Sequence, residues 1–116
     1  YGVRGKSPEE AKSIVEDAVA MSEAGAFSMV IEGVLEPIAI EITNKIACPT
    51  IGIGASAQCD GQVLVTEDML GLFDRVPKFV KKFGNMGASV EDAVREYASG
   101  VRDRSFPGPD QLYQPT

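Results

Sequence analysis

Glu32 is the residue whose type and position best suit it to chemistry. It ends a short apolar run, residues 27–32, and a carboxylate at the end of a buried strand can act as a general base. The same carboxylate can instead cap the next helix or pair with a cation, and the pattern alone favours neither role. Histidine is absent from the sequence, which excludes a Ser-His-Asp triad, a Cys-His pair and a His-ligated zinc within this chain.

The elements around Glu32 alternate between helix and strand. Three apolar runs bounded by Gly, Pro or Asp predict buried strands at residues 27–32, 50–54 and 62–65. A helix from Ser7 and Pro8 to a left-handed cap at Gly25 precedes the first strand, with Glu10 completing a capping box. A second helix, residues 36–46, precedes the next strand. This order predicts a parallel α/β sheet, with Glu32 at the carboxyl end, where such folds carry their chemistry.

The connection between the second and third strands is the weak point of this prediction. Residues 55–61 are few for a parallel crossover, which usually needs a dozen or more residues. Either the crossover is one tight helical turn or the third strand is misplaced.

The second half of the chain is predicted to be mostly helical. One helical turn is expected at residues 66–71 and a covering helix with a solvated face at residues 77–83. A last helix, residues 90–104, is expected to be capped by Ser89 and to bury a stripe formed by Val90, Ala93, Val94, Tyr97 and Val101. Residues 106–116 are expected to form an extended tail, frayed from residue 111.

Other polar, small and cationic residues have a favoured structural interpretation. Gly52 and Gly54 are predicted to allow close backbone packing rather than to contact a ligand. Asp60 is predicted to cap a turn rather than to hold a neighbouring loop. Cys48 and Cys59 are expected to be small core residues rather than a disulfide pair. Solvent exposure is favoured over an anion site for Lys78, Lys81 and Lys82.

Composition limits the class of protein. The chain has 116 residues, 44% hydrophobic residues and a net charge of −6, which is ordinary for one soluble domain and disfavours nucleic acid and anionic membranes as partners. No apolar stretch approaches the roughly 20 residues of a membrane span, and no signal peptide opens the sequence. Three apolar strands would leave an open sheet edge, which natural proteins avoid, so we expect a piece of a larger sheet or barrel.

The chain resembles the C-terminal portion of the ketopantoate hydroxymethyltransferases. Seven segments carry the resemblance in the right order and spacing. They are Val3-Arg-Gly5, Val30-Ile-Glu-Gly-Val34, Pro49-Thr-Ile-Gly-Ile-Gly-Ala55, Asp60-Gly-Gln-Val-Leu-Val65, Asp68-Met-Leu-Gly-Leu-Phe73, Pro77-Lys-Phe79 and Phe106-Pro-Gly108.

The resemblance implies a fold, a reaction and a role for Glu32. Residues 1–116 would form the C-terminal portion of one (β/α)₈ TIM-type barrel, with about its last three strands and the C-terminal helices. The family reaction transfers a hydroxymethyl group from 5,10-methylenetetrahydrofolate to 3-methyl-2-oxobutanoate and gives 2-dehydropantoate, in pantothenate biosynthesis. Glu32 matches the family's catalytic base. The Mg²⁺ ligands are expected in an N-terminal half that this sequence lacks, without which the chain would be inactive. A cytoplasmic homo-oligomer, of decamer type, is also implied.

Three positions depart from the family pattern, and two other interpretations stay open. Residues 33–35 replace a common Cys-Val-Pro, Ser56 replaces a glycine, and Glu67 stands where a histidine is common. The first two alter the loops beside Glu32, and the third removes a polar ring. The alternatives are a non-catalytic α/β module in which Glu32 is structural, and another keto-acid barrel enzyme of the phosphoenolpyruvate-utilising type.

Overall fold

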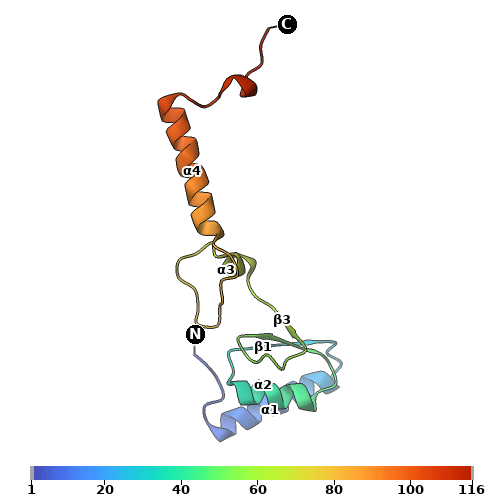
Figure 1. Ribbon diagram of the computed structural model, residues 1–116. Coiled ribbons are helices and arrows are strands. Elements are labelled where there is room, and N and C mark those ends of the chain that lie inside the picture. Colours follow the sequence, from blue (N-terminus) through green and yellow to red (C-terminus); the bar gives the residue numbers. More distant parts are fainter. Residues whose placement is uncertain (1, 116) are drawn as a thin grey trace. The chain divides into compact units, whose positions relative to one another are not determined.

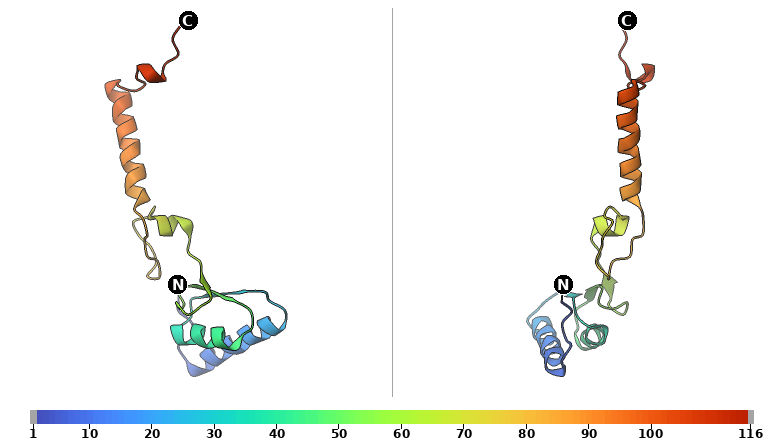
Figure 2. Two further views of the ribbon diagram at one scale, coloured as in Figure 1. Left: turned by 45° about the vertical axis from the view of Figure 1, so that its right-hand side comes forward. Right: turned by 90° about the vertical axis from the view of Figure 1, so that its left-hand side faces the viewer.

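A parallel three-stranded sheet with two helices on one face is formed by the first part of the chain (Figures 1 and 2). The computed structural model describes residues 2–115 and divides into two units, Tyr1–Val65 and Thr66–Thr116. The sheet lies in the first unit and has the strand order β1-β2-β3, with both strand pairs parallel. The predicted α/β class with a parallel sheet is confirmed.

Helix α1, Pro8–Glu23, begins and ends at the predicted signals. Ser7 caps it by accepting a hydrogen bond from the backbone N–H of Glu10 at 3.2 Å. At the other end, Gly25 has a φ of 106°, and the N–H groups of Gly25 and Ala26 donate to the carbonyls of Ser22 and Met21. This is the Schellman arrangement, in which a left-handed glycine lets the chain satisfy the last carbonyls.

The strands are shorter than the apolar runs that predicted them. Strand β1 is Met29–Glu32. It begins later than predicted because the residues after Gly25 lead the chain away from α1. Phe27, in this connection, is 91% exposed. Helix α2 is Glu36–Lys45 and strand β2 is Thr50–Ile53.

Strand β3, Gly61–Gln62, corrects the predicted third strand at residues 62–65. The connection before it is a loop without a helix. Such a short crossover suffices because Gly61 pairs with Ile51, only two residues back from the end of β2.

The core of the first unit lies between the helices and one face of the sheet. Strand β1 alternates, with Met29 and Ile31 buried and Val30 and Glu32 exposed. The buried pair packs with residues of α1, α2 and the loop before β3, namely Val15, Ala18, Ile38, Ala39, Ile42, Ala55 and Cys59. The opposite face carries no helix of this unit within the described residues (Figure 2).

The second unit contains α3, Thr66–Leu70, and α4, Met86–Asp103, joined by an irregular loop. The helix predicted at residues 77–83 is wrong, since that segment has only a turn closed by the Val80 N–H and the Pro77 carbonyl. The loop instead closes on α3, because the N–H of Phe83 donates to the carbonyl of Met69 at 2.8 Å. A helix over residues 77–83 would not let the chain fold back to make this hydrogen bond.

Helix α4 begins earlier than predicted, and Ser89 lies inside it. Asn85 is the N-cap residue and makes no capping hydrogen bond with its side chain. The N–H of Gly87 donates instead to the carbonyl of Gly71 at 3.0 Å. A tertiary backbone contact therefore satisfies a donor in the first turn of α4, two residues before the serine that was predicted as the cap.

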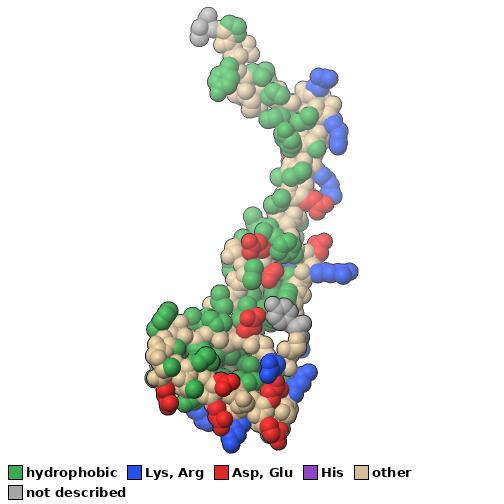
Figure 3. All heavy atoms as spheres, turned by 180° about the vertical axis from the view of Figure 1, so that it is seen from behind, with side chains coloured by type: hydrophobic (Ala, Val, Ile, Leu, Met, Phe, Trp, Pro, Cys, Tyr) green, Lys and Arg blue, Asp and Glu red, His purple; other side chains and the backbone are tan. Residues whose placement is uncertain are grey.

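The predicted burial of the α4 stripe is also wrong. Val94 and Tyr97 are each 60% exposed, and Val90 and Val101 are about half exposed. Figure 3 shows hydrophobic side chains along one side of this helix and charged side chains along the other. Within the described residues, none of the side chains of α4 is buried.

The chain after α4 is more ordered than the extended tail that was predicted. Arg104 ends the helix with a φ of 65°, and the Phe106 N–H donates to the Gly100 carbonyl at 3.1 Å. The Phe106 ring packs edge-on against Tyr97, with centroids 5.6 Å apart. A 3₁₀ helix, Pro109–Gln111, follows. Within residues 2–115, no helix combines the length and apolar character needed to cross a membrane.

Candidate active site

Glu32 occupies the last position of β1, at the carboxyl end of the sheet, as the sequence predicted. Paired residues of parallel strands share a face, and Val30 and Glu32 pair with Ile51 and Ile53 of β2. Glu32 is therefore the one carboxylate among these four positions, on the face that carries no helix of this unit. An apolar wall that ends in an exposed carboxylate can place a base beside a small organic substrate.

The turn after Glu32 is short and is held by backbone hydrogen bonds. Gly33 has a φ of 67°, and nothing lies within 4 Å of the position that a Cβ would take there. Arg4 forms a parallel bridge with Val34, in which the Arg4 N–H donates to the Gly33 carbonyl at 2.7 Å. The Leu35 N–H donates back to the Arg4 carbonyl at 3.2 Å. The segment before α1 thus fixes the turn that follows the carboxylate.

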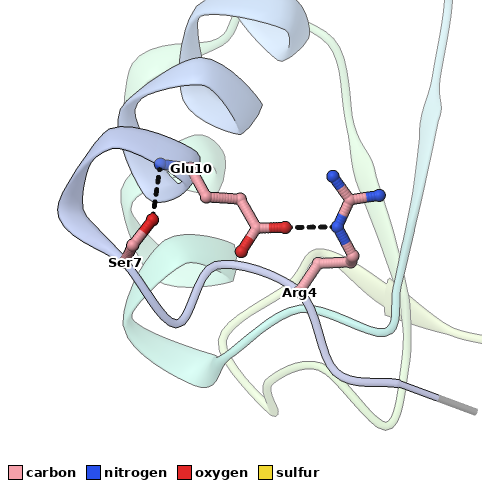
Figure 4. Close-up of polar contacts among 3 residues, drawn as sticks. All are labelled: Arg4, Ser7 and Glu10. Atoms are coloured by element: carbon pink, nitrogen blue, oxygen red, sulfur yellow. Dashed lines mark hydrogen bonds and ion pairs between the residues drawn. The ribbon is translucent and has the colours of Figure 1, made fainter.

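Arg4 is itself attached to the start of α1 through an ion pair with Glu10 (Figure 4). The Arg4 guanidinium hydrogen-bonds the carboxylate of Glu10, and this contact lowers the pKa of Glu10 below its ordinary value of 4.5. Half of the predicted capping box is confirmed, because Ser7 receives its hydrogen bond. The other half is wrong: the Glu10 carboxylate turns to Arg4, which offers a stronger, charged donor.

Ser56 joins the loop after β2 to the beginning of α2. It is 7% exposed, and its hydroxyl donates to Oε1 of Glu36 at 3.1 Å and accepts from the N–H of Gln58 at 3.1 Å. The Ser56 carbonyl accepts from the side-chain amide of Gln62 at 2.7 Å. The sequence identified Ser56 as a departure from the family pattern but did not predict its contact with Glu36, which lies 20 residues away.

The amino ends of β2 and β3 carry a second polar cluster, around Thr50. The Thr50 N–H donates to Oδ2 of Asp60 at 2.8 Å. Asp60 therefore joins β2 to the start of β3. The prediction that it caps a turn is wrong. Gly52 has the predicted packing role, because a Cβ there would lie 3.1 Å from Sγ of Cys59 and 3.2 Å from the Gln62 amide. This cluster lies at the end of the sheet opposite to Glu32, and its hydrogen bonds join two strands, which fits a structural role.

The cysteines, the lysines and Glu67, which the sequence also singled out, have the following surroundings. Cys48 and Cys59 are free, as predicted. Lys81 lies over the Phe83 ring with Nζ 5.0 Å from its centroid, and Lys82 donates to the Asp74 carbonyl at 3.2 Å. Glu67 is exposed in the first turn of α3. Residues 2–115 contain no group of three or more Cys, Asp or Glu side chains placed to hold a metal ion.

The comparisons with known proteins define the class to which this fold and site belong. The family of ketopantoate hydroxymethyltransferases matches residues 1–109, so the chain belongs to that family. It is 75% identical to the 3-methyl-2-oxobutanoate hydroxymethyltransferase of Sphingopyxis alaskensis, over 97% of this chain and 39% of that protein. It is 64% and 62% identical to the proteins of the same name from Erythrobacter litoralis and Novosphingobium aromaticivorans. In both, the match covers 99% of this chain and 40% of the relative.

The chain therefore spans about 40% of the length of these relatives. That share fits the predicted C-terminal portion of a longer enzyme.

Proposed function

We propose that this chain is the C-terminal portion of a barrel enzyme that transfers a hydroxymethyl group from 5,10-methylenetetrahydrofolate to 3-methyl-2-oxobutanoate. The product would be 2-dehydropantoate, an intermediate of pantothenate biosynthesis. One observation carries the proposal beyond family membership. Glu32 ends β1 on the face that no helix of its unit covers, which is the face that a closed barrel turns inward.

The reaction requires removal of a proton from the carbon next to a ketone, which is a weak acid in water. We assign this proton to the carboxylate of Glu32, the base at the carboxyl end of the strand. The apolar neighbours Val30, Ile51 and Ile53 would line the branched carbon chain of the keto acid and limit the access of water. The enolate carbon then forms a C–C bond with the one-carbon unit, the bonds of that unit to the two folate nitrogens break, and one water supplies the hydroxyl oxygen of the product as tetrahydrofolate leaves.

Mg²⁺ is part of the proposal as a cofactor of the whole enzyme. When bound, it would act as a Lewis acid on the keto acid and stabilise the enolate. The described residues of this chain do not fit a magnesium site, so we place the ligands in an N-terminal portion of the same protein and derive no step through the metal. We also propose a cytoplasmic homo-oligomer of the decamer type.

Exchange of the substrate proton tests the role of Glu32. In the full-length protein that contains this chain, Glu32→Gln should lower deuterium exchange at C3 of 3-methyl-2-oxobutanoate by about 10²–10⁴-fold, the usual contribution of a general base. NMR in D₂O measures this exchange without folate. The control is Glu16→Gln, which makes the same change on the exposed surface of α1. Exchange near the wild-type rate in Glu32→Gln would remove this residue from the reaction and favour a structural role.

A further inference from the structure

The Ser56 hydroxyl both donates and accepts a hydrogen bond within the protein, although Ser56 lies in the loop between β2 and β3. It donates its one proton to Glu36 and accepts the Gln58 N–H, both at 3.1 Å. A buried hydroxyl with both functions satisfied adopts a single orientation. The loop after β2 is thus attached to the first residue of α2.

That attachment lies close to Glu32 along the chain. Glu36 opens α2, and only residues 33–35 separate it from Glu32. Backbone bonds from Arg4 hold Gly33 and Leu35 from the side of the chain that precedes α1. Ser56 holds the far end of the same turn from the side of β2. The turn therefore has one anchor on each side of β1.

We propose that Ser56 is a positioning residue for Glu32, acting through Glu36 and the turn between them. This inference rests on the proposed function, because it concerns the same proton abstraction. A general base works only within hydrogen-bond reach of the proton that it removes. Catalytic groups must be held to within about 0.5 Å of the productive geometry, and a displacement of about 1 Å costs about 10²-fold. Strand pairing with Ile53 fixes the backbone of Glu32 on one side, but Gly33 has no side chain to hold the turn that follows by packing. The anchors at the ends of the turn therefore hold the backbone on the other side of the carboxylate.

The test uses four variants of the full-length protein, Ser56→Ala, Glu36→Ala, their combination, and Glu36→Gln. We expect Ser56→Ala and Glu36→Ala each to lower proton exchange and kcat about tenfold, with KM for the keto acid unchanged. The combined variant should be no slower than either single one, because both remove the same contact. Glu36→Gln should keep most of the exchange, because its amide oxygen still accepts from the serine. Ser13→Ala, an exposed serine on α1, is the matched control.

Three results would overturn the inference. They are wild-type exchange in Ser56→Ala, losses that multiply in the combined variant, and a rise in KM in place of a fall in kcat. If Ser56→Ala does not fold, the comparison of Glu36→Ala with Glu36→Gln decides, because Glu36 is exposed. A failure of the proposed function is distinct, because it appears as normal exchange in Glu32→Gln. With Glu32→Gln inactive and Ser56→Ala normal, only the positioning role fails.

Discussion

Thr50 allows the polar and the apolar contributions at the amino ends of the strands to be separated. It is 0% exposed. Its hydroxyl lies 3.2 Å from Oδ2 of Asp60, 3.2 Å from the Asp60 backbone nitrogen and 2.9 Å from Oγ1 of Thr43. Thr43 donates its own proton to the Ala39 carbonyl at 2.8 Å. The Thr50 proton therefore goes to Asp60 or to Thr43, and its oxygen accepts the Asp60 N–H.

The sizes of the two effects predict an order of stability for two substitutions. Thr50→Val keeps the shape but removes the hydrogen bond that the hydroxyl donates to Asp60 or Thr43, and it leaves the Asp60 N–H without an acceptor. Together these cost about 2–4 kcal/mol. Thr50→Ser keeps the hydroxyl and removes one buried methyl, which costs about 1 kcal/mol plus a small cavity term. The isosteric valine should therefore destabilise the protein more than the smaller serine.

Urea unfolding of the full-length protein measures both free energies. The variants are compared by circular dichroism at one protein concentration, because the stability of the proposed oligomer would depend on concentration. A valine variant as stable as the serine variant, or more stable, would refute the reasoning. It would mean that packing around Thr50 outweighs its hydrogen bonds to Asp60.

Two further predictions concern a glycine and an ion pair. Gly71→Ala should unfold at a lower urea concentration than Gly33→Ala. Both glycines have φ near 70°, but a Cβ at Gly71 would lie 2.1 Å from the Gly84 carbonyl oxygen, whereas Gly33 faces open space. Equal losses of stability would show that backbone conformation alone sets the cost. Arg4→Gln should raise the pKa of Glu10 in an NMR titration, because the Arg4 hydrogen bond lowers it. Because the pKa of Glu10 is lowered in the folded protein, its ionised carboxylate stabilises the fold at pH values above the ordinary carboxyl pKa. This stabilisation is lost as the pH falls through the pKa of Glu10 in the folded protein. The stabilities of wild type and Arg4→Gln should therefore converge at low pH.

Local signals predicted the first unit well. The cap at Ser7 and the left-handed Gly25 set the bounds of α1, because both depend on residues within one helical turn. The position of Glu32 also followed locally, since the apolar run ends at the carboxylate. The side-chain contact that holds the turn after Glu32 did not follow. The bond between Ser56 and Glu36 joins residues 20 apart in sequence, and no periodicity reports such a pair.

The second unit was predicted less well because non-local backbone contacts decide it. Periodicity predicted a helix at residues 77–83, yet the loop folds back so that Gly84 lies against Gly71 and Leu70. The fold-back also lets the Gly71 carbonyl accept the N–H of Gly87 in the first turn of α4. The helix therefore begins before the serine that sequence rules favour. Helix propensity is worth only a few tenths of a kcal/mol per residue, and closure of a loop against a backbone easily outweighs it.

The exposure of two apolar surfaces, one on α4 and one on β1, has one physical explanation. Hydrophobic periodicity identifies the face that an element covers, but it does not identify the element that covers it. The stripe on α4 around Val94 is exposed within its own unit, and so is Val30 on the helix-free face of the sheet. Both surfaces are regular and apolar, as expected of elements made to be packed. Because the chain spans about 40% of its relatives' length, residues outside it can supply the missing contacts. The face that carries Glu32 would then be covered only in the longer protein.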